Sequence, residues 1–334
     1  MSDDGLFKFN INDTGGAIAV SKEYPVFRTK GLNSTFLLAK LNDGLDFKHF
    51  AFSQKAGGTR TRLYFSRLCE WHTLLPSLAE QNKVADCLTS LDELIAAQAQ
   101  KVEALKSHKK GLMQRLFPRE GETQPPLRFP EFQDSGDWAD SPMGTLLMHP
   151  PSYGVNAAAV PFSEDLPQYL RITDISEDGH YLPEKRVSVN LQAADQNYLE
   201  EGDVVLARTG ASVGKSYKYR KEDGRLVFAG FLIRVKPHPK KLVSAYLANY
   251  LKTGSFWNWV AVASARSGQP GINSTQYSSL SIPLPPMLAE QQHIASCLSS
   301  LDAKITGETQ KLEAFKTHKM GLMQQLFPSA EVEG

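Results

Sequence analysis

The sequence predicts an α+β chain in which β-rich globular domains alternate with two long helices that pair as an antiparallel coiled coil. Three observations carry this prediction. One long segment occurs twice, both copies have the apolar spacing of a helix, and short β-branched runs with glycine turns fill much of the remainder. The 334 residues, of which 41% are hydrophobic and 22% charged, are enough for two or more folded domains.

The long segment spans residues 78–118 and recurs without gaps as residues 288–328. The two copies are identical at 25 of 41 positions, which indicates an internal duplication. In each copy apolar residues follow one another at steps of three, four or seven, the pattern of a coiled-coil seam. At 1.5 Å per residue each helix is about 58 Å long, and two such seams in one chain pack most simply against each other.

The seam positions of both copies are predicted to hold the two helices together. They are Leu88, Leu91, Ile95, Val102, Leu105 and Leu112 in the first copy, and Leu298, Leu301, Ile305, Leu312, Phe315 and Leu322 in the second. Polar residues interrupt both seams at equivalent places, Gln98 with Glu308 and Lys109 with Lys319. Such interruptions are typical of positions that fix the register of a coiled coil.

These patterns divide the chain into five predicted segments. They are a truncated N-terminal globular domain (1–76), a first long helix (77–118), a complete second globular domain (119–285), a second long helix (286–328) and a tail (329–334). The first domain is expected to be truncated because residues 24–42 parallel residues 231–252, each with an apolar strand, a turn and a short helix. The second domain has about 90 further residues before Tyr217, and these have no counterpart.

No segment has the residue pattern of a catalytic centre. Residues 204–219 resemble a phosphate-binding loop, but Gly210 and Gly214 enclose three residues where that loop needs four, and a strand is expected to follow. Three scattered cysteines favour neither a metal cluster nor a disulfide framework. We therefore expect no enzymatic activity, metal or cofactor in this chain; a nucleotide-dependent enzyme is the alternative that the 204–219 loop leaves open.

Charge is distributed unevenly although the net charge is only +1. Residues 140–204 contain 3 Lys and Arg against 11 Asp and Glu, whereas residues 205–285 contain 12 against 2. A basic stretch interleaved with aromatic residues is typical of a surface that faces phosphates. No window is apolar enough for a membrane span and the N-terminus lacks a signal pattern, so we expect a cytoplasmic protein.

Several motifs resemble the specificity subunits of type I restriction-modification systems. The resemblance rests on the repeated helix and on the stretches LRFPEF…W, YLRITDISEDG, GDVVLARTGASVGK and SGQPGINSTQYSSLSIPLPP, which follow one another between residues 127 and 286. It covers the chain from about residue 5 onward. The order of globular domain and long helix, each occurring twice, is also that of the family.

The resemblance implies a subunit for DNA recognition in phage defence and DNA methylation. Each globular domain would be a target-recognition domain that reads one half of a bipartite site in double-stranded DNA, and the helix pair would hold the two domains apart. Methyltransferase (M) subunits would dock on this chain and bind S-adenosylmethionine, and a separate restriction/translocase (R) subunit would cleave DNA. This chain would bind no cofactor itself.

Three loops and one tyrosine supply the residues expected at DNA. Glycine-bearing loops let the backbone approach phosphates, arginine suits guanine, and asparagine or glutamine suits adenine. The candidates are Arg208, Ser212, Lys215, Lys218, Arg266, Gln269, Asn273, Gln276, Arg60, Arg62 and Tyr153.

Two other interpretations follow from the expected truncation. The chain could be a decoy or regulatory subunit that binds the methyltransferase subunit without productive sequence recognition. Alternatively, two copies could associate through their helices, so that two complete domains would read a symmetric sequence.

Overall fold

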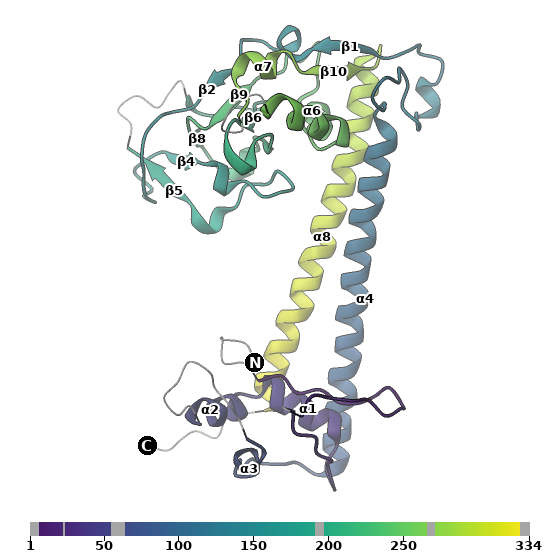
Figure 1. Ribbon diagram of the computed structural model, residues 1–334, viewed down its shortest axis with the longest axis vertical. Coiled ribbons are helices and arrows are strands. Elements are labelled where there is room, and N and C mark those ends of the chain that lie inside the picture. The colour runs from purple at the N-terminus through teal and green to yellow at the C-terminus, as the bar shows by residue number, and fades with distance from the viewer. Residues whose placement is uncertain (1–6, 23, 55–63, 191–196, 266–270, 328–334) are drawn as a thin grey trace. The chain divides into compact units, whose positions relative to one another are not determined.

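The computed structural model of the chain forms two compact units (Figure 1). Unit 1 comprises residues 1–104 and 305–334, and unit 2 comprises residues 105–304. The structure describes residues 7–22, 24–54, 64–190, 197–265 and 271–327. Each unit contains one part of both long helices.

The two long helices are copies of each other in extent as well as in sequence. Helix α4 (Leu78–Leu116) and helix α8 (Leu288–Leu326) each have 39 residues, and their ends differ by the repeat offset of 210. They run side by side in Figure 1. All twelve predicted seam residues are buried or partly buried, among them Leu88 and Leu298. The predicted α+β fold with two long paired helices is confirmed.

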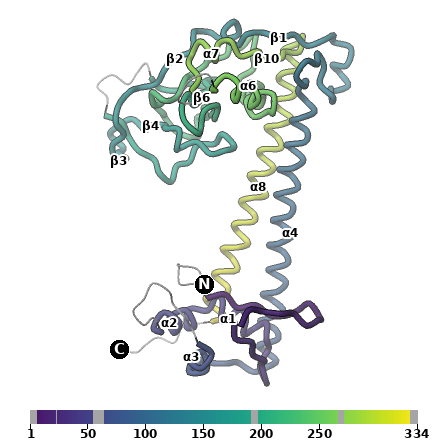
Figure 2. The backbone as a smooth tube through the Cα atoms, in the orientation of Figure 1, coloured from purple at the N-terminus to yellow at the C-terminus, as the bar shows by residue number. Residues whose placement is uncertain are grey.

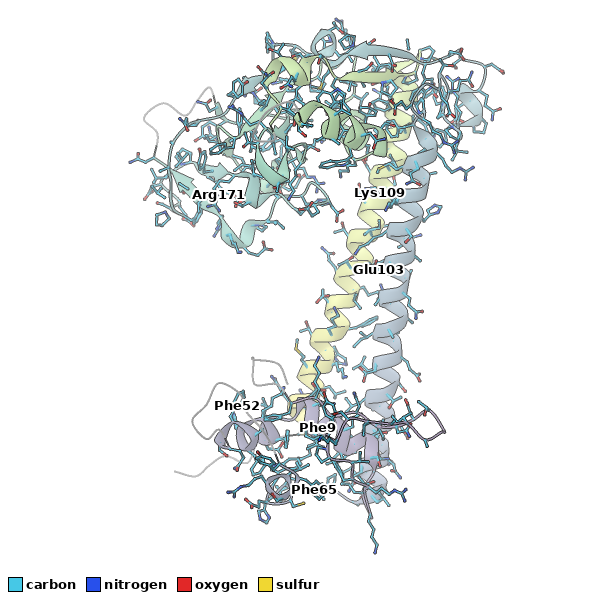
Figure 3. The ribbon with its side chains drawn as sticks, in the orientation of Figure 1. Phe9, Phe52, Phe65, Glu103, Lys109 and Arg171 are labelled. Carbon is cyan, nitrogen blue, oxygen red and sulfur yellow. The ribbon has the colours of Figure 1, made fainter. Side chains whose placement is uncertain are left out.

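The polar residues within the seams explain the antiparallel register. In unit 1 the Gln98 amide donates to the backbone oxygen and the carboxylate of Glu308, at 2.9 and 2.7 Å. In unit 2 Lys109, labelled in Figure 3, forms an ion pair with Asp302 at 2.5 Å. The repeat counterparts of these two residues, Lys319 and Asp92, form the same ion pair at 2.6 Å in unit 1. Each long helix therefore contributes the lysine of one ion pair and the aspartate of the other.

Unit 1 contains three short helices besides its parts of α4 and α8. They are α1 (Ser34–Asp43), α2 (Leu45–Ser53) and α3 (Phe65–Leu68). Helix α1 begins after Asn33, whose side chain accepts the Phe36 N–H at 2.9 Å. Phe36 is buried against Val84 and Leu88 of α4 and against Phe327.

The prediction of a strand at the start of residues 24–42 was wrong, whereas the helix that follows it is present as α1. No strand is assigned in the described part of unit 1. In unit 2 the corresponding strand is hydrogen-bonded on both sides. The described residues of unit 1 provide no such flanking strands, and an isolated strand cannot satisfy its backbone groups.

Unit 2 contains all the assigned strands, arranged as three small sheets. One pairs β1 with β10, one has the order β2-β9-β6-β7, and one has the order β3-β5-β4-β8. Within them only β4 and β8 are parallel neighbours. The strands are β1 (Ala139–Pro142), β2 (Ser152–Tyr153), β3 (Ala159–Pro161), β4 (Gln168–Leu170), β5 (Val187–Val189), β6 (Val204–Ala207), β7 (Ser216–Lys218), β8 (Leu226–Phe228), β9 (Leu232–Val235) and β10 (Ser281–Leu284).

Three helices complete unit 2 and correspond to those of unit 1. They are α5 (Ser244–Tyr250), α6 (Gly254–Ser264) and α7 (Ser274–Ser278). Helix α5 begins 210 residues after α1, so the internal repeat extends beyond the long helices. The main core of unit 2 joins these helices to β6, β9 and the neighbouring parts of α4 and α8. Figure 2 shows β1 and β10 together near the start of α8, where this core lies.

The two units anchor their short helix in the same way. Phe117, which follows α4, packs on Tyr246 of α5 with ring centroids 5.1 Å apart. Phe327, which follows α8, packs on Phe36 of α1 at 5.2 Å. Each long helix thus begins in one unit and ends with an aromatic side chain in the core of the other, as the duplicated sequence requires.

Candidate nucleic-acid interface

Two of the predicted DNA-contacting loops lie next to each other in unit 2. Thr209 and Gly271 form an antiparallel bridge, and the Ile272 N–H donates to the Arg208 carbonyl oxygen at 2.8 Å. Strand β6 fixes the start of the first loop, and the start of α7 fixes the end of the second. Their adjacency arises from long-range pairing that the linear sequence does not display.

Tyr153, Arg208 and Ser274 form one cluster on this surface, hereafter the Arg208 cluster. The Arg208 guanidinium carbon lies 4.7 Å from the centroid of the Tyr153 ring, within the range of a cation–π contact. The Ser274 N–H donates to the Tyr153 hydroxyl oxygen at 3.1 Å, and the two hydroxyl groups are 3.2 Å apart. Tyr153 is 41% exposed, so the cluster faces solvent.

The electrostatics of the cluster suit an anionic ligand. Hydrogen bonding with the Ser274 hydroxyl and then with the Ser274 N–H lowers the pKa of Tyr153, and the charge of Arg208 lowers it further. No ion pair to Arg208 is present among the described residues, so no described carboxylate competes for its donors. A planar guanidinium beside an exposed aromatic ring can bind a phosphate or the edge of guanine and can stack on a base.

Asn273 and Gln276, two of the predicted DNA contacts, bond to each other at the start of α7. They form a capping box at α7, in which Asn273 Oδ1 accepts the Gln276 N–H at 2.8 Å and Gln276 Oε1 accepts the Asn273 N–H at 2.9 Å. The Gln276 amide also donates to the Ala263 carbonyl oxygen at 3.3 Å. A two-hydrogen-bond contact with adenine would require this cap to open. In the structure the pair instead positions Ser274 next to Tyr153.

Lys215 and Lys218 are not brought into the Arg208 cluster. The Lys215 ammonium forms an ion pair with Glu177 at 2.6 Å and donates to the Ile175 carbonyl oxygen at 3.2 Å. Lys218 is partly buried in β7, and burial lowers the pKa of its ammonium group. Ser212 is partly buried in a short 3-10 turn.

The remaining predicted DNA contacts lie outside the described residues. These are Arg60, Arg62, Arg266 and Gln269.

The two glycines of the 208–218 loop differ in what they permit. Gly210 has a positive φ of 75° and open space around it, so its backbone is accessible. Gly214 has a φ of 88°, and a Cβ there would lie 2.9 Å from Val260 and 3.1 Å from Trp257. Gly214 therefore allows α6 to pack closely, rather than allowing phosphate to approach. The strand expected after it is confirmed as β7, so the loop lacks the helix of a nucleotide-binding loop.

Ser274 was not among the predicted DNA contacts, and two exposed aromatic residues of the basic stretch, Phe231 and Trp257, lie near this loop. Phe231 is 60% exposed, and its carbonyl oxygen accepts the Arg208 N–H at 3.0 Å. Trp257, 44% exposed, lies on α6 beside Gly214. The pattern Asn-Ser-Thr-Gln is that of a capping box and could have identified Ser274 as a positioned residue.

The segregation of charge along the sequence is partly neutralised within unit 2. Lysines and arginines of the basic stretch form ion pairs with carboxylates of the acidic stretch. The pairs are Lys215–Glu177, Lys221–Glu201, Lys236–Glu200 and Arg234–Asp203. The inference that the whole basic stretch is a phosphate-facing surface was therefore too broad, because it counted charges that neutralise one another in the fold.

The described residues show neither a metal-binding cluster nor a membrane-spanning helix. No group of three or more His, Cys, Asp or Glu side chains in them is arranged to hold a metal ion. Within the same residues, every helix is too short or too polar to cross a membrane.

Residues 164–317 match the family described as type I restriction modification DNA specificity domain. The MjaVIII type I restriction enzyme specificity subunit of Methanocaldococcus jannaschii is 25% identical over 262 residues, which cover 75% of this chain and 60% of that protein. The MjaX specificity subunit of the same organism is 29% identical over 137 residues, which cover 40% of this chain and 32% of that protein.

A solved structure shares the fold. The S subunit of a type I restriction-modification system from M. genitalium aligns with a TM-score of 0.57 and 12% identity, covering 90% of this chain and 74% of that one. Residues 164–317 thus match the DNA specificity domain of type I restriction-modification systems, and the curated relatives are type I specificity subunits, the class of protein that the motifs resembled. The matched family model is described as a DNA specificity domain, and both curated relatives are named as specificity subunits. The matched regions span about a third and 60% of the two curated relatives.

Proposed function

We propose that this chain is the sequence-reading subunit of a type I restriction-modification complex and that the Arg208 cluster contacts DNA. The observation that carries the proposal is the pairing of the two loops at Thr209 and Gly271, inside the region that matches the DNA specificity domain. This pairing places a cation, an exposed tyrosine and a positioned serine on one surface. Arg208 would bind a base edge or a phosphate, and Tyr153 would limit its orientations.

The helix pair would serve as the docking site for methyltransferase subunits. The seam residues of each helix pack against the other helix, while the outer faces of α4 and α8 are mostly exposed and carry mixed charges. On this proposal S-adenosylmethionine binds to the methyltransferase subunit, and a restriction/translocase subunit joins the same assembly. Each unit would present its loops to one half of a bipartite site in cytoplasmic DNA.

A decoy or regulatory role is the second candidate function. It is favoured by the absence of strands in the described part of unit 1, since a recognition domain is otherwise β-rich. Such a chain would occupy the methyltransferase subunit without productive sequence reading. Overexpression would then decrease modification of the cell's DNA.

Binding selection from a random duplex library distinguishes the two functions. The purified assembly of this chain with its methyltransferase subunit is mixed with the library, and bound DNA is sequenced. Enrichment of a defined motif that Arg208→Ala weakens supports sequence reading. A stable assembly that enriches no motif contradicts it and favours the decoy. A symmetric motif together with a dimer in solution would indicate self-association through the helices.

A further inference from the structure

The Arg208 cluster spans three neighbouring strands of unit 2, and Phe231 lies directly before the middle one. These strands have the order β2-β9-β6 (Figure 1). Tyr153 belongs to β2 and Arg208 follows β6, so their cation–π contact crosses the start of β9. Phe231 is the residue before β9, and it therefore lies next to the cluster.

Backbone contacts on both sides fix the position of Phe231. Its carbonyl oxygen accepts the Arg208 N–H at 3.0 Å, and the N–H of the preceding Gly230 donates to the Val155 carbonyl oxygen at 2.7 Å. A Cβ atom at Gly154 would lie 2.4 Å from a carbonyl oxygen of this turn, so the glycine lets the chain after β2 approach it closely. The turn is thus held by backbone contacts, which do not depend on the Phe231 side chain.

The Phe231 side chain faces solvent. It is 60% exposed, whereas Phe228, three residues earlier, is fully buried in a core of unit 2. Tyr153 of the neighbouring cluster is 41% exposed. The Arg208 cluster and Phe231 together therefore present a cation, a phenol and a hydrocarbon ring to solvent.

A phenylalanine side chain can distinguish base pairs by one chemical group. It has no hydrogen-bond donor or acceptor, and the C5-methyl group of thymine is the apolar group that base edges present in the major groove. Guanine presents two acceptors there, which suit the guanidinium of Arg208. Phe231 and Arg208 therefore match different bases, and both can act in one groove.

We propose that Phe231 is a specificity-determining residue that packs against the C5-methyl group of a thymine in the half-site contacted by Arg208. This inference rests on the proposed function, since its ligand is the DNA that the chain reads. It adds that the target motif contains a thymine whose methyl group contributes to binding.

Two observations favour contact with a base edge over insertion of the ring between stacked bases. Inserted apolar side chains act from the minor groove and kink the duplex, whereas Arg208 beside Phe231 matches the major-groove edge of guanine. The bonds to Arg208 and Val155 also hold the turn between two flanking segments of backbone, which limits how far the ring can enter a base stack.

Binding selection from a random duplex library first supplies the target motif, and each thymine in the motif is then replaced by deoxyuridine. Uracil pairs as thymine does and lacks only the C5-methyl group. At one position the replacement is expected to weaken binding of the methyltransferase-containing assembly about threefold to tenfold in fluorescence anisotropy. Phe231→Ala should weaken binding to the thymine duplex by a similar factor and abolish the difference between thymine and uracil. Phe231→Leu, which keeps an apolar side chain, should retain part of that difference.

Leu182→Ala is the matched control, because Leu182 is an exposed apolar residue of unit 2 outside the Arg208 cluster. It should leave both the affinity and the effect of uracil unchanged, and circular dichroism verifies the fold of each variant. The inference is overturned if no thymine in the motif is sensitive to loss of its methyl group, if Phe231→Ala leaves that sensitivity intact, or if Phe231→Ala weakens binding to both duplexes equally. In these cases an enriched motif that depends on Arg208 still supports the proposed function, whereas enrichment of no motif would refute both.

Discussion

Replacing Glu290 with alanine is expected to destabilise unit 2 far more than the same replacement at its repeat counterpart, Glu80. Arg128 makes two hydrogen bonds to the Glu290 carboxylate and a third to the Gly136 carbonyl oxygen at 2.7 Å. In the variant only the third remains, and the guanidinium stays almost fully buried. Removing one partner of a buried ion pair costs about 3–5 kcal/mol. The Glu80 side chain is exposed, and such surface changes stay within about 0.5 kcal/mol.

Urea unfolding followed by tryptophan fluorescence measures this difference. Trp138, Trp257 and Trp259 belong to unit 2, so the signal reports mainly on that unit. A lower midpoint with an unchanged slope for Glu290→Ala shows a loss of stability rather than a change in the unfolded state. The reasoning is refuted if Glu290→Ala costs less than about 1 kcal/mol, or if Glu80→Ala costs as much as Glu290→Ala.

Three further predictions concern the helix seam, a buried lysine and the DNA cluster. Leu298→Ala should destabilise the helix pair by about 2–5 kcal/mol in thermal unfolding, whereas Leu94→Ala should have little effect because Leu94 is 46% exposed. Equal losses of stability in the two variants would contradict the prediction that Leu298 lies in the seam. Burial lowers the pKa of Lys252 to about 8 from its ordinary 10.5, so the unfolded chain binds more protons between these values and stability rises with pH there. Lys252→Met should therefore be more stable than the wild type below pH 8, by a margin that shrinks toward pH 10.5; urea midpoints that show a constant margin would refute this. Arg208→Ala should weaken binding of the methyltransferase-containing assembly to its target duplex by about 1–3 kcal/mol in fluorescence anisotropy, and Lys215→Ala by much less, because Glu177 already holds that ammonium; equal effects would count against the Arg208 cluster.

The internal repeat made the long helices predictable from the sequence alone. Two aligned copies show directly which apolar positions recur, and the polar interruptions at Gln98 and Lys109 marked the register positions. The sequence did not indicate which residues the side chains of Gln98 and Lys109 would contact. Gln98 binds the residue at its own repeat position, Glu308, while Lys109 binds Asp302, which only an antiparallel arrangement brings close.

The candidate site could be predicted only as a set of loops. Which loops adjoin one another depends on the bridge between Thr209 and Gly271, which joins residues far apart in the sequence. The local pattern indicates that Asn273 caps a helix, whereas we predicted that Asn273 contacts the edge of a base. The position of Lys215 next to Glu177 is a tertiary contact that no local pattern indicates.

Residues 24–42 show a related limit. The parallel between residues 24–42 and 231–252 predicted both a strand and a helix, but only the helix is present. A helix satisfies its own backbone hydrogen bonds, whereas a strand depends on neighbours. Similar local sequences can therefore form the same helix in both units and a strand in only one.

A genome-wide map of N6-methyladenine tests the central claim most directly. The map is recorded in cells that express this chain together with its cognate methyltransferase subunit, and in cells that express the methyltransferase subunit alone. The account predicts a new sequence motif that requires this chain and is reduced by Arg208→Ala. A stable complex of the two subunits that adds no methylated motif would contradict the claim that this chain reads DNA sequence.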